Sequence, residues 1–140
     1  MTKITAVYQG NLRTLCTHEA SGQTLQTDAP VDNHGKGEFF SPTDLLGTAM
    51  GSCILTLMGI AAEQKYKVDI TGTHVAIEKT MSTTPPRRVA QLDIHVTIPH
   101  SFSPEIQAGI EKAALTCPVH ESLHPEIKQN ITFNWGTAYA

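Results

Sequence analysis

The sequence predicts an α+β fold in which largely antiparallel sheets wrap around a long, buried central helix. Three observations support this prediction: a stretch without charge from Leu45 to Ala62, period-two alternation on both sides of it, and a second amphipathic stretch from Ser103 to Cys117. The expected element order is β-β-β-α-β-β-α-β. Because a chain of 140 residues has the length of one domain, we expect a single domain over residues 1–140.

Alternation of apolar and polar residues predicts six strands. The first three are expected at residues 3–9, 12–18 and 23–28, and the others at 70–80, 89–98 and 127–135. Gly10 and the residues beside it form the first turn. The segment from Ala29 to Phe40 contains prolines and glycines and is expected to be a loop.

The central helix begins at a recognisable signal. Ser41 can cap its N-terminus, Pro42 suits the first helical position, and Asp44 stands where a capping box places an acid. Since the following residues are apolar on nearly all sides of a helix, we expect the helix to be buried all round. A membrane span is an alternative on length alone, and a polar row containing Ser52 and two threonines argues against it.

Cys53 lies in the middle of this helix. It shares a stripe with Leu46, Ala49, Met50, Leu57 and Ile60. The second helix is expected to start at Ser103 and to end at Cys117, with a short turn around Glu121 to Leu123 after it. Taken singly, Cys53 and Cys117 are more often small buried hydrophobes than reactive groups, and Cys16 in the second strand belongs to no motif.

Composition limits the partners and the compartment. The formal net charge is -3 with 16% charged residues, which gives no electrostatic case for nucleic acid. The N-terminus lacks the apolar run of a signal peptide, so we expect a cytoplasmic protein. In a reducing compartment the three cysteines do not form a structural framework, and a disulfide among them is expected to be transient and catalytic.

Two cysteine motifs together resemble a known family. The helix start Ser-Pro-Thr-Asp-Leu-Leu, the Gly-Ser-Cys that ends at Cys53, and Cys117-Pro-Val some sixty residues later are similar to the OsmC/Ohr family of osmotically induced and organic hydroperoxide resistance proteins. The resemblance covers nearly the whole chain. It implies an OsmC-like fold and an intertwined homodimer with active sites at the subunit interface.

The resemblance also implies a function. It is that of a thiol peroxidase without metal or other cofactor, in which Cys53 attacks an organic hydroperoxide to give a sulfenic acid. Cys117 then resembles the resolving cysteine that closes a disulfide. The implied partners are the hydroperoxide and a dithiol reductant, typically a lipoyl group carried on a protein, with no nucleic acid and no membrane.

The chemistry requires a cation near the reacting sulfur. An ordinary thiol with a pKa of ~8.5 is a few per cent thiolate at neutral pH, and the thiolate is the nucleophile. Arginine tolerates burial best among the cations. Arg87 and Arg88 follow two prolines in what is expected to be a solvated turn, whereas Arg13 corresponds, by its distance to Pro30, with the arginine that similar peroxidases use. Arg13 is therefore the predicted partner of the thiolate, and the alternative is that it is an exposed cation on its strand.

The sequence departs from the peroxidase branch at the helix start. Proteins of that branch carry Asn-Pro-Glu, and their glutamate holds the arginine in place, whereas this chain has Thr43 followed by Asp44. Asp44 is either the arginine's partner or only a helix cap, and we favour the cap. A second departure is His120, where relatives often have serine.

A different class of function is also open. Cys117, His120 and His124 follow one another at a helical spacing, and with Cys53 they form a set of ligands that zinc accepts. The alternative is therefore a non-catalytic binding protein on the same fold. It would hold a metal through these four residues, or a small apolar ligand at the dimer interface.

Overall fold

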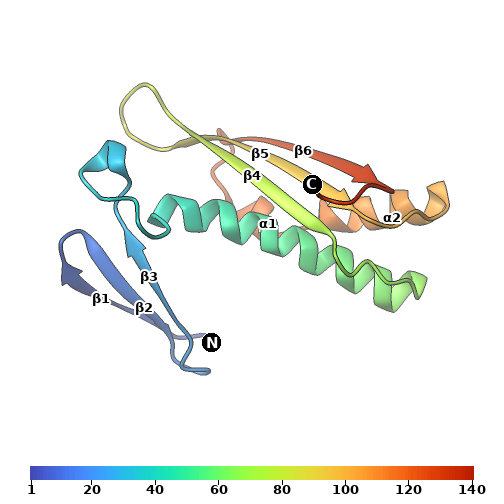
Figure 1. Ribbon diagram of the computed structural model, residues 1–140, viewed down its shortest axis with the longest axis horizontal. Coiled ribbons are helices and arrows are strands. Elements are labelled where there is room, and N and C mark those ends of the chain that lie inside the picture. Colours follow the sequence, from blue (N-terminus) through green and yellow to red (C-terminus); the bar gives the residue numbers. More distant parts are fainter. The chain divides into compact units, whose positions relative to one another are not determined.

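The structure, a computed structural model that describes all residues from 1 to 140, confirms the predicted α+β class. It contains two three-stranded sheets, in the orders β1-β2-β3 and β4-β5-β6 (Figure 1). The chain divides into two compact units, Met1–Leu46 and Gly47–Ala140. Each unit is described by itself.

The first unit contains an antiparallel sheet. Its strands are β1 (Ile4–Gly10), β2 (Arg13–His18) and β3 (Thr24–Asp28), each within one residue of the predicted bounds. The loop after β3 holds one 3-10 turn, at Val31–Asn33. Many apolar side chains of this sheet are exposed, among them Ile4, Val7, Tyr8 and Leu25. A three-stranded sheet with so little buried surface does not form an independent core.

The central helix α1 (Pro42–Ile60) begins with the predicted capping box. The hydroxyl of Ser41 accepts a hydrogen bond from the backbone N–H of Asp44 at 3.1 Å, and the Asp44 carboxylate accepts one from the N–H of Ser41 at 2.8 Å. After Ile60 the helix continues as a π-helical segment, η2 (Ala61–Tyr66). The sequence did not predict this change of winding. The segment ends at Lys67, whose φ of 55° places it in the left-handed region.

The prediction that this helix is buried on all sides is wrong for the single chain. The buried residues are Gly47, Met50, Gly51, Ile54 and Met58, which share one face. Thr48, Ala49, Ser52 and Thr56 on the opposite face are exposed. The apolar composition of α1 therefore does not mean that a single chain buries every side of this helix.

Glycine allows the buried face of α1 to approach the sheet closely. A Cβ at Gly51 would lie 2.3 Å from Cδ1 of Ile77. By length and composition alone, Pro42–Tyr66 is able to cross a membrane, with a mean hydropathy of 1.8. Core helices of soluble proteins have the same property, and here the apolar face packs on a sheet of the same chain.

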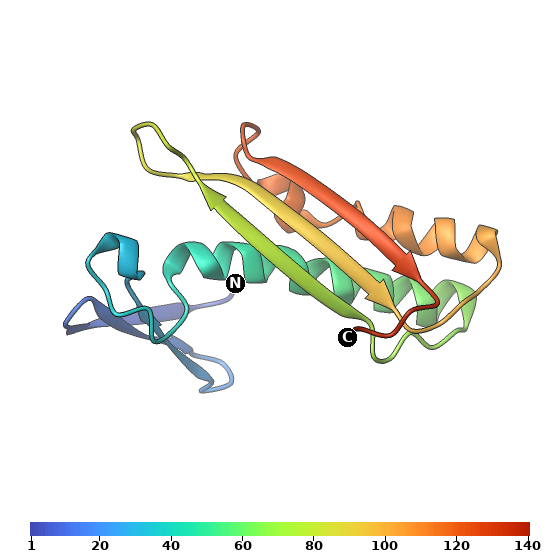
Figure 2. The same ribbon diagram turned by 45° about the horizontal axis from the view of Figure 1, so that its top comes forward.

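The second unit contains β4 (His74–Met81), β5 (Val89–Ile98) and β6 (Lys128–Trp135). The pair β4/β5 is antiparallel as predicted, whereas β5 and β6 run parallel. The helices between β5 and β6 return the chain to the start of the sheet, which a parallel pair requires. Figure 2 shows α1 and α2 (Pro104–Ala114) on one side of this sheet. The buried residues of β5 are Val89, Leu92, Ile94, Val96 and Ile98.

The second helix starts as predicted and ends early. Ser103 caps it by accepting a hydrogen bond from the N–H of Ile106 at 3.4 Å. The expected end at Cys117 is wrong, because α2 ends at Ala114 and a new helix, α3 (Pro118–Ser122), replaces the expected turn. Pro118 lacks an N–H and suits a first helical position, so Cys117 begins a helix.

Candidate active site

The second unit brings the two motif cysteines together. Cys53 is half-buried on α1, Cys117 is fully buried ahead of α3, and both are free thiols. Their side chains are joined by a hydrogen bond, and this bond is one cause of a raised pKa at Cys117. Two sulfurs separated by sixty-four positions in the sequence therefore meet, one on α1 and the other at the N-cap of α3.

Cys117 is the N-cap of α3. Its sulfur accepts a hydrogen bond from the backbone N–H of His120 at 3.4 Å. Burial is the largest influence on this thiol and raises its pKa, and the hydrogen bond with Cys53 raises it further. The N–H groups of His120 and Val119 oppose these effects, and the net direction is upward. Cys117 therefore keeps its proton at neutral pH.

Cys53 lies at the boundary between the two faces of α1. On its predicted stripe, Met50 is fully buried, whereas Ala49 and Ile60 are exposed. The sulfur is thus placed beside the apolar core without being enclosed by it. A half-buried thiol on such a boundary can be reached by a small apolar molecule.

Arg13 belongs to the first unit and is held there by acids. Its guanidinium lies 2.5 Å from the carboxylate of Glu38 and 3.7 Å from that of Asp28, and it stands over the ring of Phe39 at 5.1 Å. Asp28 is 1% exposed, and one of its two oxygens has no hydrogen-bond partner. The other accepts a hydrogen bond from the N–H of Glu38 at 3.1 Å. Arg13 is therefore an anchored cation rather than a free surface charge.

The sequence did not lead to a prediction of the two acids that hold Arg13. Asp28 faces Arg13 across the β2/β3 pair, so the register of the hairpin carried a signal for it. Glu38 lies in an irregular loop, where no periodicity indicates a contact. Asp44, the candidate partner named from the sequence, completes the capping box with Ser41.

Cys16 and Arg88 have ordinary surroundings. The sulfur of Cys16 lies 3.7 Å from the hydroxyl of Thr14 on the same strand. Arg88 is partly exposed and pairs with Glu126 at 3.5 Å, as expected for a solvated turn.

The four residues of the metal alternative do not form a metal site. The structure contains no group of three or more His, Cys, Asp or Glu side chains that could hold a metal ion. Nδ1 of His120 lies 2.5 Å from Oε1 of Gln129 on β6, and Nδ1 of His124 accepts a hydrogen bond from the N–H of Glu126 at 3.2 Å. Both imidazoles are thus turned toward other partners.

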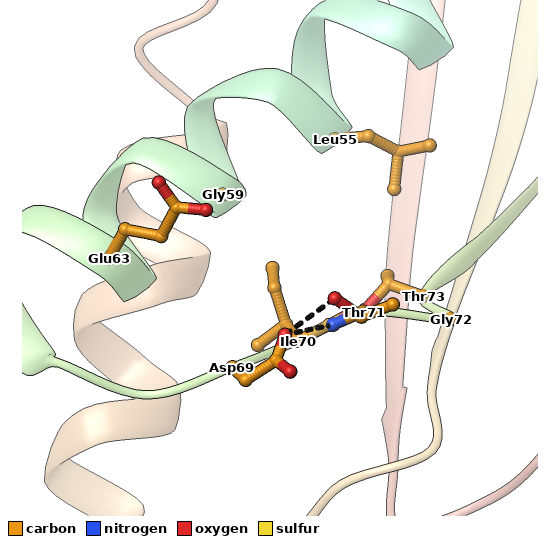
Figure 3. A pocket seen from close by; sticks show the side chains of 8 residues that line it. All are labelled: Leu55, Gly59, Glu63, Asp69, Ile70, Thr71, Gly72 and Thr73. Atoms are coloured by element: carbon orange, nitrogen blue, oxygen red, sulfur yellow. Dashed lines mark hydrogen bonds between the residues drawn. The ribbon is translucent and has the colours of Figure 1, made fainter.

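A hollow of about 260 Å³ lies elsewhere in the second unit (Figure 3). Glu63 and Asp69 give it an acidic character. The hydroxyl and the N–H of Thr71 both donate to Asp69, at 2.6 and 2.8 Å, and these hydrogen bonds lower the pKa of that carboxyl. No cysteine lines this hollow, so it is not the site of thiol chemistry.

Comparisons with known proteins agree with this architecture. A family model for OsmC-like protein matches residues 35–132. A crystal structure from Psychrobacter arcticus is 45% identical over 96% of both chains with a TM-score of 0.90, and its name assigns it only provisionally to the osmotic stress and detoxification response. No curated protein matches the sequence significantly.

More distant structures share the fold. The organic hydroperoxide resistance protein OsmC from Legionella pneumophila is 16% identical over 96% of both chains, with a TM-score of 0.75. An organic hydroperoxide resistance protein from Elizabethkingia anophelis is 18% identical over 96% of this chain and 95% of that one, also with a TM-score of 0.75. The resemblance inferred from the two cysteine motifs is confirmed: this chain belongs to the OsmC-like protein family.

Proposed function

We propose that this chain is a thiol peroxidase that reduces organic hydroperoxides. The observation that carries the proposal is the hydrogen-bonded pair of Cys53 and Cys117, because two neighbouring free thiols are the requirement for a peroxidase that closes a disulfide. The names of distant relatives as organic hydroperoxide resistance proteins agree with it.

The proposed reaction has two steps. The Cys53 thiolate attacks the terminal oxygen of the hydroperoxide, so the O–O bond breaks, Cys53 becomes a sulfenic acid, and the alkoxide takes a proton to leave as an alcohol. The Cys117 sulfur then attacks the Cys53 sulfur and displaces hydroxide, which leaves as water with the thiol proton. A dithiol reductant returns both sulfurs to thiols by exchange.

The state of Cys117 supports this division of roles. Its pKa is raised mainly by burial, so it remains a thiol while Cys53 acts as the attacking sulfur. Cys53 is the more accessible of the two, as an external substrate requires.

We assign Arg13 as the positive charge that assists the thiolate. Its anchoring by Glu38 and Asp28 supports the assignment, because a guanidinium fixed in one orientation loses little entropy when it binds an anion. Asp44 is assigned as a helix cap. Replacement of Arg13 by Ala is expected to lower kcat/KM for a hydroperoxide by about 100-fold, the usual effect of losing one charge-stabilising donor.

Consumption of cumene hydroperoxide with dihydrolipoamide as reductant tests the function. The wild-type protein should turn over, and Cys53→Ser should not. Cys16→Ser is the matched control, since Cys16 lies in the other unit and belongs to neither motif. Activity of Cys53→Ser equal to wild type would refute the proposal.

We further propose a homodimer in the cytoplasm. The exposed face of an otherwise apolar α1 and the exposed apolar residues of the first sheet are surfaces that a second copy could cover. Three free thiols suit a reducing compartment. Sedimentation should give a mass twice the 15.2 kDa of the chain, and a monomer at micromolar concentration would contradict the dimer.

A further inference from the structure

One residue links the resolving cysteine to the sheet. His120 donates its backbone N–H to the Cys117 sulfur at 3.4 Å, while its imidazole Nδ1 lies 2.5 Å from Oε1 of Gln129 on β6. Because the amide oxygen of Gln129 is an acceptor, Nδ1 carries the hydrogen of this bond. The first turn of α3 is thus tied to β6 through the same residue that contacts the sulfur.

The surroundings make that side-chain bond important. His120 and Gln129 both border a hollow of about 330 Å³, which also contacts Glu121, Leu123 and His124. An imidazole beside open space is not fixed by packing alone. The hydrogen bond to Gln129 therefore helps to fix the orientation of the ring.

The backbone N–H groups that contact the Cys117 sulfur in turn determine the direction of its S–H group. The sulfur accepts from the N–H groups of His120 and Val119, and full burial removes water as a competing partner. The hydrogen-bonded neighbour that remains for the S–H group is Cys53. A shift of the first turn of α3 would release the sulfur from this orientation.

We propose that His120, anchored by Gln129, is a positioning residue that aims the Cys117 thiol at Cys53 and so accelerates disulfide closure. The inference rests on the proposed peroxidase function. It concerns only the second step, in which the S–S bond forms, the S–O bond of the sulfenic acid breaks, and water leaves. The imidazole acts through α3 and takes no part in the attack of Cys53 on the hydroperoxide.

The test separates the two steps. Reduced protein is mixed with one equivalent of cumene hydroperoxide in the presence of dimedone, which traps sulfenic acid, and intact masses are followed over time. His120→Ala and Gln129→Leu should each close the disulfide roughly tenfold more slowly than wild type, as expected for a displaced reacting group, and should accumulate the dimedone adduct. The rate of the first oxidation should be unchanged.

Two variants serve as controls. His120→Asn should restore rapid closure, because its side-chain N–H₂ can donate to Gln129 from nearly the same position as Nδ1. His124→Ala removes from the same hollow an imidazole whose Nδ1 bonds to the N–H of Glu126, and should close like wild type. Thermal unfolding of each variant verifies that it is folded.

A second measurement needs no peroxide. In a Cys53→Ser background, His120→Ala should be alkylated at Cys117 by iodoacetamide roughly tenfold faster than its parent, since a released α3 exposes the sulfur. Closure at the wild-type rate in both His120→Ala and Gln129→Leu overturns the inference and leaves the peroxidase proposal intact. If the wild type forms neither sulfenic acid nor disulfide, the peroxidase proposal fails. In that case the alkylation experiment still tests the positioning role, which is overturned if Cys117 is alkylated at the same rate with and without His120→Ala.

Discussion

The guanidinium of Arg13 lies 2.5 Å from the carboxylate of Glu38, a residue of the loop that precedes the central helix. The carboxylate that holds this arginine therefore comes from the loop, whereas the family resemblance predicts one at the start of the helix. Glu38→Gln keeps the shape of the side chain and removes its charge. We expect kcat/KM for a hydroperoxide to fall by about tenfold, because the guanidinium is less well oriented. Steady-state kinetics check this, and Glu121→Gln, an exposed acid of the other unit, is the control.

Asp44 has a different predicted effect. Asp44→Ala removes the acceptor for the N–H of Ser41 and should lower the free energy of unfolding by about 1 kcal/mol, the usual effect of losing a helix cap. Urea denaturation measures this loss. If Asp44→Ala lowered kcat/KM more than Glu38→Gln at a temperature where both are folded, the assignment of the arginine's partner would be wrong.

Two glycines of α1 provide a matched test of its packing. A Cβ at Gly51 would lie 2.3 Å from Ile77, whereas a Cβ at Gly59 would meet nothing within 4 Å. Both variants to Ala gain the same helix propensity, so the difference between them reports the clash alone. We expect Gly51→Ala to be less stable than Gly59→Ala by about 1–3 kcal/mol in urea denaturation. Equal stabilities would show that α1 does not approach β4 as described.

The stability of the reduced protein should fall at alkaline pH. Below the ordinary pKa of a thiol, the folded and unfolded chains both keep the Cys117 proton. Above it the unfolded chain loses that proton first, because burial holds the pKa of the folded thiol higher, so the free energy of unfolding decreases until the folded thiol also ionises. In Cys117→Ser this decrease should be shallower. Denaturant titrations under reducing conditions between neutral pH and pH ~10 measure the two slopes, and identical slopes would contradict the raised pKa.

The strands and the helix starts could be predicted because their signals are local. Alternation located β1, β2 and β3 to within one residue, and β5 without error. The capping groups of Ser41 and Ser103 fixed where the two main helices begin. Such signals depend on neighbours within one helical turn or one strand, and a single sequence contains them.

Other features depend on contacts between distant segments. The parallel pairing of β6 and the attachment of Arg13 to Glu38 have no local signature. Helix α3 has such a signature, since Pro118 suits a first helical position, but a proline is equally typical of the residue that follows the end of a helix. The meeting of Cys53 with Cys117 was implied by the resemblance of two motifs, and periodicity alone did not identify it.

The thiol pair itself provides the most direct test of the proposed function. One equivalent of cumene hydroperoxide is added to the fully reduced protein, free thiols are counted, and the linked peptides are identified by mass spectrometry. We predict the loss of two of the three thiols, with Cys53 and Cys117 joined and Cys16 still free. Three remaining thiols, or a disulfide that includes Cys16, would contradict the proposed peroxidase.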